Sequence, residues 1–416
     1  MRSLDPRTED EVARGHDHRA SALMNLGIAE LWTLHLDEAH RDLEEALALA
    51  RRIGRPYLEV GCLGHLALAS ILENAPPDAS LRFSEAAAAI AARHGWGTHR
   101  ILAPAGAAAA IGLAWHGRTD EAEGWLGRIA GAHPPPPEVE TEPTLHYARA
   151  FVRLGQGRLE EGLHELRATY RLLGSLDPDH PLRRDVTGLV VLVQALGGEG
   201  SAARAALAAA KREERDNPGM RLAAAALALA NDEPDAALEA VAPMVLGTPA
   251  TLHPRWATIH ALLFDAAARD QLGDRAGAEA SIERALELAE PDGVVLQFML
   301  APVRELLERH PRHRTMHATL LSTILGVLAG RAPPARGATA PLRDELSEAE
   351  LRVLRYLPSN LTAPEIAAEL MLSANTVRTH MRRIYAKLGA HSRAAAVTRA
   401  RDLGLLGAQP ARARVT

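Results

Sequence analysis

A unit of about forty residues recurs along most of this chain. An apolar helical run is followed by a short turn with Gly or a charged residue, and then by a second run that opens with an acidic and a small residue. The seven small residues are Ala39, Ala79, Ala122, Gly162, Ala202, Ala236 and Ala278. Their spacings are 40, 43, 40, 40, 34 and 42 residues. Because one helical hairpin cannot bury its own apolar face and stacked hairpins can, the pattern predicts about seven stacked hairpins.

The composition indicates an all-α fold. Alanine, the strongest helix former, is abundant, while aromatic residues make up only 3% of the chain. The single cysteine, Cys62, excludes an internal disulfide and a thiolate zinc cluster. No apolar run is long enough to span a membrane, and residues 1–19 lack the apolar core of a signal peptide, so a soluble cytoplasmic protein is expected.

The hairpins over residues 20–328 resemble tetratricopeptide (TPR) repeats in a long variant. The resemblance implies a superhelix with a concave surface, which senses a protein or small-molecule effector that the sequence does not name. Five tryptophans lie in or between the repeat helices: Trp32, Trp96, Trp115, Trp125 and Trp256. For each of them, packing between helices is the favoured interpretation and a ligand cage is the alternative.

Proline and glycine mark the domain boundary. Residues 329–345 contain Pro333, Pro334 and Pro341 without apolar periodicity, which predicts a Pro/Ala-rich linker. The predicted order is a polar N-terminal segment (1–19), the repeat domain (20–328), the linker (329–345), a C-terminal domain (346–406) and a flexible tail (407–416).

The C-terminal domain contains clear helix-start signals. Ser347 with Glu350, and Thr362 with Glu365, have the spacing of a capping box, and Ser373 opens a third helix after a short turn. That third helix carries one apolar stripe: Val377, Met381, Ile384, Tyr385 and Leu388. Two short helices joined by a tight turn, the second of them amphipathic, are typical of a helix-turn-helix.

The opposite face of the third helix is polar and basic. Asn375, Thr379 and Arg382 lie opposite the apolar stripe, flanked by Arg378 and Arg383. Residues 371–401 include seven basic residues and no acidic one, in a chain whose net charge is −5. Positive charge concentrated in one segment of an acidic protein indicates a polyanionic partner.

This domain resembles the LuxR-type DNA-binding domain. The matching pieces are E-I-A at 365–367, L-S-x-x-T-V-R-x-H at 372–380, K-L-G at 387–389, S-R at 392–393 and L-G-L-L at 403–406. The resemblance implies a four-helix domain whose third helix enters the major groove of a double-stranded DNA operator. It also implies that the fourth helix pairs two subunits into a homodimer on DNA, with RNA polymerase as a further partner.

The resemblance also assigns roles to residues of the third helix. Arg378, Thr379 and Arg382 match positions that face bases, and Asn375 joins them from the same face of the helix. Thr376 and Lys387 match positions near phosphates, and Arg383 joins that second set from the flank of the helix.

The resulting hypothesis is a sequence-specific DNA-binding transcription regulator that associates with the nucleoid. The alternative is a helical-repeat scaffold whose C-terminal module mediates protein contacts. No catalytic motif, metal-ligand pattern or cofactor site is predicted. The large LuxR regulators carry an ATPase module, but Lys211 has none of the glycines that a phosphate-binding loop needs, so ATP switching within this chain is not expected.

Overall fold

The computed structural model describes residues 6–73, 77–130, 141–246, 254–310, 315–333, 346–358, 361–388, 390 and 393–402. Those residues form helices and turns and contain no strand, which confirms the predicted all-α fold. The chain divides into two compact units, Met1–Pro334 and Ala335–Thr416, and each is described here by itself. In the described residues, no helix is long and apolar enough to cross a membrane. The predicted tail (407–416) and most of the predicted linker lie outside the described residues.

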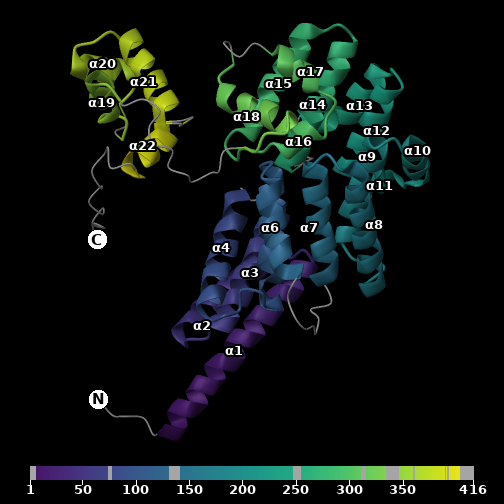
Figure 1. Ribbon diagram of the computed structural model, residues 1–416, viewed down its shortest axis with the longest axis vertical. Helices are drawn as coiled ribbons and strands as arrows, with labels where there is room; N and C mark the ends of the chain where they lie inside the picture. The colour runs from purple at the N-terminus through teal and green to yellow at the C-terminus, as the bar shows by residue number, and fades with distance from the viewer. Residues whose placement is uncertain are drawn as a thin grey trace. The chain divides into compact units, whose positions relative to one another are not determined.

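The first unit is a series of packed antiparallel helices (Figure 1). Its longer helices are α1 (Pro6–Trp32), α2 (Leu36–Arg52), α3 (Pro56–Leu72), α4 (Pro77–Arg93), α5 (Ala103–Trp115), α6 (Thr119–Ala130), α7 (Thr141–Gly155), α8 (Leu159–Leu176), α9 (Leu182–Leu196), α10 (Gly200–Ala209), α12 (Pro218–Ala230), α13 (Pro234–Leu246), α14 (Arg255–Gln271), α15 (Arg275–Ala289) and α18 (Ala318–Leu328). Short helical segments lie between them: η1 (Arg100–Leu102), α11 (Arg212–Arg215), α16 (Leu296–Met299) and α17 (Arg304–Arg309).

Helix α1 begins at Pro6 and continues without a break to Trp32, so it crosses the boundary predicted at residue 19. Two ion pairs connect α1 to α2 and to the residue before α3. Asp17 pairs with Arg55 at 2.8 Å, and Arg19 pairs with Glu45 at 2.5 Å.

The turns inside the hairpins share one backbone geometry. A residue with φ between 59° and 86° precedes the N-cap of the second helix, and the N-cap amide donates to the carbonyl five residues earlier at 2.9 Å. In six hairpin turns, the residue with positive φ is Leu34, Gly117, Gly157, Gly198, Asp232 or Gly273. Glycine adopts this left-handed conformation at the lowest cost, which explains why the predicted turns are rich in it.

In three hairpins, the small residue that is buried is not the one that the sequence pattern selects. Ala79 is half-buried and Ala202 and Ala236 are exposed, whereas the residue after each of them is fully buried. The buried set is Ala39, Ser80, Ala122, Gly162, Ala203, Ala237 and Ala278. Their spacings are 41, 42, 40, 41, 34 and 41, so the structure gives a more regular period than the sequence alignment.

These small residues occupy one structural position. In six hairpins the amide of the small residue donates to the carbonyl of the N-cap residue at 2.9–3.2 Å, which makes the first full helical hydrogen bond of the second helix. The available space there is limited: a Cβ on Gly162 would lie 2.7 Å from Leu154 Cδ2. A small residue at this position therefore allows the two helices of a hairpin to approach closely.

The last part of the unit contacts the third hairpin. The amide of Val295 donates to the carbonyl of Trp115 at 2.8 Å, and the His116 ring lies 2.9 Å from the carbonyl of Asp292. Helix α16 packs on α5 and α7. Helix α18 closes the same region, because a Cβ on Gly117 would lie 3.2 Å from Val327. We call the contact of Trp115 and His116 with Asp292 and Val295 the closing contact.

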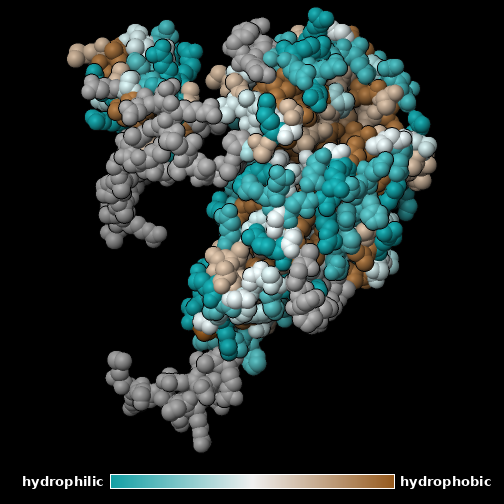
Figure 2. Space-filling model, in the orientation of Figure 1, coloured by the Kyte–Doolittle hydropathy of each residue, from teal (hydrophilic) through white to brown (hydrophobic). Residues whose placement is uncertain are grey.

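Apolar side chains fill the interior of the unit and polar ones cover it. On the face shown in Figure 2, hydrophilic side chains cover most of the surface, and hydrophobic ones appear mainly in recesses between helices. The interior includes fully buried Leu43, Ile111, Leu166 and Phe264. Burial of such side chains is the main favourable term that holds stacked hairpins together.

Candidate DNA interface

The second unit contains four helices around a small core of its own. They are α19 (Glu348–Leu354), α20 (Ala363–Leu370), α21 (Ala374–Leu388) and α22 (Arg393–Asp402). The fully buried side chains in this core come from all four helices: Val353, Leu354, Ile366, Val377, Ile384, Ala396 and Ala400. This arrangement positions α21 with one face against the core and the other toward solvent.

The helix starts follow the predicted capping pattern. The Glu350 amide donates to Ser347 Oγ at 3.3 Å, and the Ser347 amide donates to Glu350 Oε2 at 2.8 Å. The Thr362 amide donates to Glu365 Oε2 at 2.6 Å. Hydrogen bonds from the Thr362 hydroxyl and amide lower the pKa of Glu365. Glu350 and Glu365 therefore act as carboxylates that fix the starts of α19 and α20.

A tight turn joins α20 to α21. Met371 ends α20 in the left-handed conformation, with φ of 53°, and its side chain is 93% exposed. Ser373 Oγ accepts the amide of Thr376 at 3.0 Å and so caps α21. The helix-turn-helix geometry predicted from the sequence is present.

Helix α21 separates its apolar and polar side chains. Val377, Ile384 and Leu388 are buried, while Met381 and Tyr385 are half-buried, as the sequence predicted for the apolar stripe. The other side of the helix carries the predicted base-facing set: Asn375, Arg378, Thr379 and Arg382. Of these, Asn375, Arg378 and Arg382 are exposed, and Thr379 is half-buried with its hydroxyl donating to the Asn375 carbonyl at 2.9 Å.

The three predicted phosphate contacts share one flank of α21, but their side chains are in different states. Arg383 is exposed. Thr376 is half-buried, and its hydroxyl lies 2.7 Å from Ser373 Oγ. The Lys387 ammonium has a partner inside the domain, because it donates to Glu350 Oε2 at 2.8 Å. Lys387 therefore connects α21 to the start of α19, a role that sequence reasoning missed.

Arg393 also has a structural role that the sequence did not reveal. Its Nε donates to the Leu357 carbonyl at 2.8 Å and its Nη2 to the Tyr356 carbonyl at 3.1 Å, and its Nη1 donates to the Leu361 carbonyl. The guanidinium thus satisfies carbonyls between α19 and α20 from the start of α22. Lys387 and Arg393 thus hold the domain together, while Arg378, Arg382 and Arg383 are exposed on α21.

Two histidines outside this domain have carboxylate partners that their sequence positions did not indicate. His310 Nε2 lies 2.7 Å from Glu283 Oε1, and His317 Nδ1 lies 2.7 Å from Glu290 Oε2. Among the described residues, no group of three or more His, Cys, Asp or Glu side chains could hold a metal ion. These pairs connect α15 to the segment that leads into α18.

The fold and the exposed arginine face define the second unit as a helix-turn-helix domain. Residues 344–400 match the family described as bacterial regulatory proteins, luxR family, and this segment is therefore a luxR-family helix-turn-helix domain. The chain is 42% identical over 84 residues to the probable transcriptional regulatory protein NarL of Mycobacterium tuberculosis. The aligned segment covers 20% of this chain and 38% of that protein. The chain is 53% identical over 47 residues to the Fimbriae Z protein of Escherichia coli, which covers 11% and 22%.

A third relative is a nitrate/nitrite response regulator protein homolog of Haemophilus influenzae, 43% identical over 53 residues, which covers 13% of this chain and 26% of that protein. The chain thus spans 22–38% of the length of these three relatives. The similarity concerns a segment about the size of one domain, so it carries no information on the helical repeats.

Proposed function

We propose that this protein is a sequence-specific DNA-binding transcription regulator. The observation that carries the proposal is the geometry of α21, which buries Val377 and Ile384 and exposes Arg378 and Arg382 on the other side. A helix of this kind fits the major groove, where arginine can donate to O6 and N7 of guanine together and asparagine can pair with adenine. We assign base contacts to Asn375, Arg378, Thr379 and Arg382.

Phosphate contacts are assigned to the flank of the same helix. Arg383 is exposed there, and Thr376 lies at the start of α21, where helix amides favour an anion. Lys387 was expected to be a third phosphate contact, but its ammonium already binds the Glu350 carboxylate. We therefore assign Lys387 to the support of α21, and the phosphate set to Thr376 and Arg383.

The wider regulatory role is part of the same proposal. A homodimer that pairs through α22 would present two copies of α21 to half-sites one helical turn apart. The helical repeats would sense an effector, and the bound dimer would act on RNA polymerase at the nucleoid. The luxR-family domain and the regulator names of its relatives support this role.

Selection of DNA by the purified full-length protein tests the proposal. Random DNA fragments are captured, sequenced and reduced to a shared motif, and affinity for that motif is compared with random DNA at two salt concentrations. A regulator enriches one motif and keeps its preference at the higher salt, because base contacts persist when phosphate contacts weaken. No enriched motif would instead favour the helical-repeat scaffold.

A further inference from the structure

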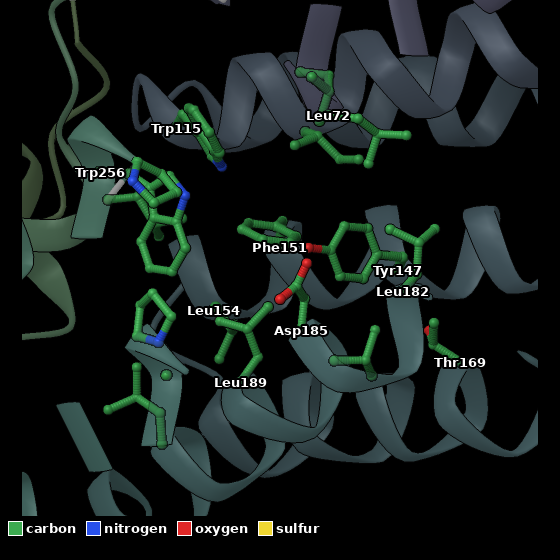
Figure 3. Close-up of a pocket in the computed structure, with 18 of the residues that line it drawn as sticks. Leu72, Trp115, Tyr147, Phe151, Leu154, Thr169, Leu182, Asp185, Leu189 and Trp256 are labelled. Atoms are coloured by element: carbon green, nitrogen blue, oxygen red, sulfur yellow. The ribbon is translucent and has the colours of Figure 1, made fainter. Parts of the chain in front are cut away.

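The first unit contains a cavity of about 350 Å³ among the first helices of its hairpins (Figure 3). Helices α1, α3, α5, α7, α9, α12 and α14 contribute lining residues, as do α8 through Thr169 and Leu173 and α16 through Leu296 and Gln297. This volume lies within the range of small-molecule sites. The closing contact bounds the cavity, because Trp115 belongs both to that contact and to the lining.

The lining is rich in aromatic rings. Three of the five tryptophans line the cavity, together with one tyrosine and one phenylalanine: Trp32, Trp115, Trp256, Tyr147 and Phe151. Phe151 contacts two of the other rings: its centroid lies 4.9 Å from that of Tyr147 and 6.3 Å from that of Trp115. Faces of such rings attract cations, most strongly the faces of tryptophan. Trp32, Trp115 and Trp256 therefore line a cavity as well as packing between helices, which favours the ligand-cage alternative for these three.

The cavity also carries a negative charge. Asp185 of α9 lines it, and the described lining residues include no lysine or arginine. Asn217 Nδ2 donates to Asp185 Oδ1 at 3.1 Å, and Figure 3 shows the Tyr147 hydroxyl pointing toward this carboxylate. Partial desolvation raises the pKa of Asp185, against the opposing effect of the Asn217 hydrogen bond. A cation in the cavity would stabilise the carboxylate.

Polar atoms of the lining lack partners. Trp115 Nε1 and Gln297 Oε1 have no hydrogen-bond partner among the described residues, and these side chains are 8% and 4% exposed. In Figure 3 the ring nitrogen of Trp115 points toward the centre of the cavity. Buried polar groups are almost always satisfied, so these two atoms are open to a partner from a ligand or from water. The indole N–H needs an acceptor, and the amide oxygen needs a donor.

We propose that this cavity binds a small organic cation: an amine with an aromatic or apolar body and one hydrogen-bond acceptor. Its ammonium pairs with Asp185 among the aromatic rings, and its acceptor receives the indole N–H of Trp115. The proposal deepens the effector-sensing role of the proposed function and rests on it for its regulatory meaning. Binding itself depends only on the first unit.

Three probes with the same ring and different charge test this proposal on the full-length protein: tyramine (cation), tyrosol (neutral) and para-hydroxyphenylacetate (anion). Isothermal titration calorimetry at neutral pH measures each affinity. Tyramine is expected to bind about tenfold or more tightly than tyrosol, since only the amine gains the ion pair and the cation–π contacts. The anion is expected to bind most weakly.

Asp185→Asn tests the assigned residue, because asparagine keeps the shape and can still accept from Asn217. This variant is expected to bind tyrosol as the wild type does and to lose the preference for tyramine. Asp179→Asn is the matched control, since Asp179 is exposed nearby on the same unit and does not line the cavity. It is expected to keep the full preference.

Three results would overturn the proposal: equal binding of tyramine and tyrosol, tighter binding of the anion, or binding of none of the probes by a folded wild type. The preference surviving in Asp185→Asn would overturn the assignment of the carboxylate. DNA selection is carried out without probe, so its outcome separates failure of this inference from failure of the proposed function.

Discussion

The ammonium of Lys387 lies 2.8 Å from Oε2 of Glu350, a carboxylate that is only 3% exposed. The same oxygen accepts the Ser347 amide, so one atom joins the capping box of α19 to the last turn of α21. Burial raises the pKa of Glu350, but hydrogen bonds from Lys387 and Ser347 together outweigh burial and lower it. The position of α21 thus depends on an ion pair within the domain.

Lys387→Ala is expected to lower the free energy of unfolding of the C-terminal unit by about 2 kcal/mol, because it leaves the Glu350 charge without its cation. The salt dependence of DNA binding should stay close to that of the wild type. Arg383→Ala on the same flank is the control: stability is unchanged, and the salt slope falls by about one unit. Urea unfolding and binding titrations measure both. If Lys387→Ala keeps full stability and flattens the salt slope, the lysine contacts phosphate as first expected.

Arg382→Ala is expected to weaken binding to the selected motif much more than binding to random DNA. The lost contact is to a base edge, and such a contact gives about 1–3 kcal/mol of discrimination. Arg352→Ala is the comparison, since Arg352 is exposed on α19 away from the base-facing set. Fluorescence anisotropy with both DNAs gives the ratio of the affinity for the motif to the affinity for random DNA. Equal losses on the two DNAs would mean that another face of α21 contacts the bases.

The C-terminal unit, produced as residues 335–416, is expected to fold and to bind DNA without the repeats. Its core is formed by its own four helices, and it is a compact unit distinct from residues 1–334. Domains of this kind usually fold alone. Circular dichroism should show helix with a cooperative unfolding transition. A fragment that is unfolded in buffer would show that the domain needs the first unit.

The same substitution at two glycines is expected to have opposite effects. Gly157 has φ of +75° and open space around it, so Gly157→Ala should lower the free energy of unfolding of the first unit by about 1 kcal/mol through backbone strain alone. Gly124 lies in the interior of α6, also with open space, so Gly124→Ala should raise it by about 0.5–1 kcal/mol. Urea titrations followed by circular dichroism compare the signs. Destabilisation of both variants would show crowding at position 124 that the structure lacks.

His260 is expected to make the first unit less stable in acid. Burial lowers its pKa from 6.5 to about 4, so the unfolded chain takes up this proton at a higher pH than the folded one. The free energy of unfolding of the first unit is therefore highest above pH 6.5 as far as His260 is concerned. It decreases as pH falls toward 4, by about 3 kcal/mol in all. His260→Gln should lose this part of the pH dependence. The unfolding midpoints of both proteins are measured across that pH range. If the midpoint depends on pH in the same way in the wild type and in His260→Gln, the loss of stability does not come from His260.

Local pattern was sufficient to predict the helices of the repeats and of the helix-turn-helix. Small residues, turn glycines and capping boxes act within a few positions, so their spacing is visible in the sequence. The one-residue error at Ala79, Ala202 and Ala236 has the same origin. Two adjacent small residues look alike in sequence, and only packing shows which one faces the first helix.

Contacts between distant segments could not be predicted. Lys387 binds Glu350, and Arg393 binds the Leu357 carbonyl, in each case across more than thirty residues of sequence. Because these partners are distant in the sequence, both basic residues were interpreted as surface charge. The cavity is a stronger case, because Trp32, Asp185 and Trp256 come from three different hairpins. The repeat period gives the number of helices but not the curvature of the stack, and the curvature decides which side chains meet.

The closing contact also limits how such a protein can change its length. An open array of repeats can gain or lose a unit at either end, since each repeat touches only its neighbours. Here Trp115 and Val295 are hydrogen-bonded across four intervening hairpins, so removing any one of those hairpins would separate the two. Duplication and deletion of repeats, the usual route by which arrays diversify, would therefore open the cavity rather than enlarge it.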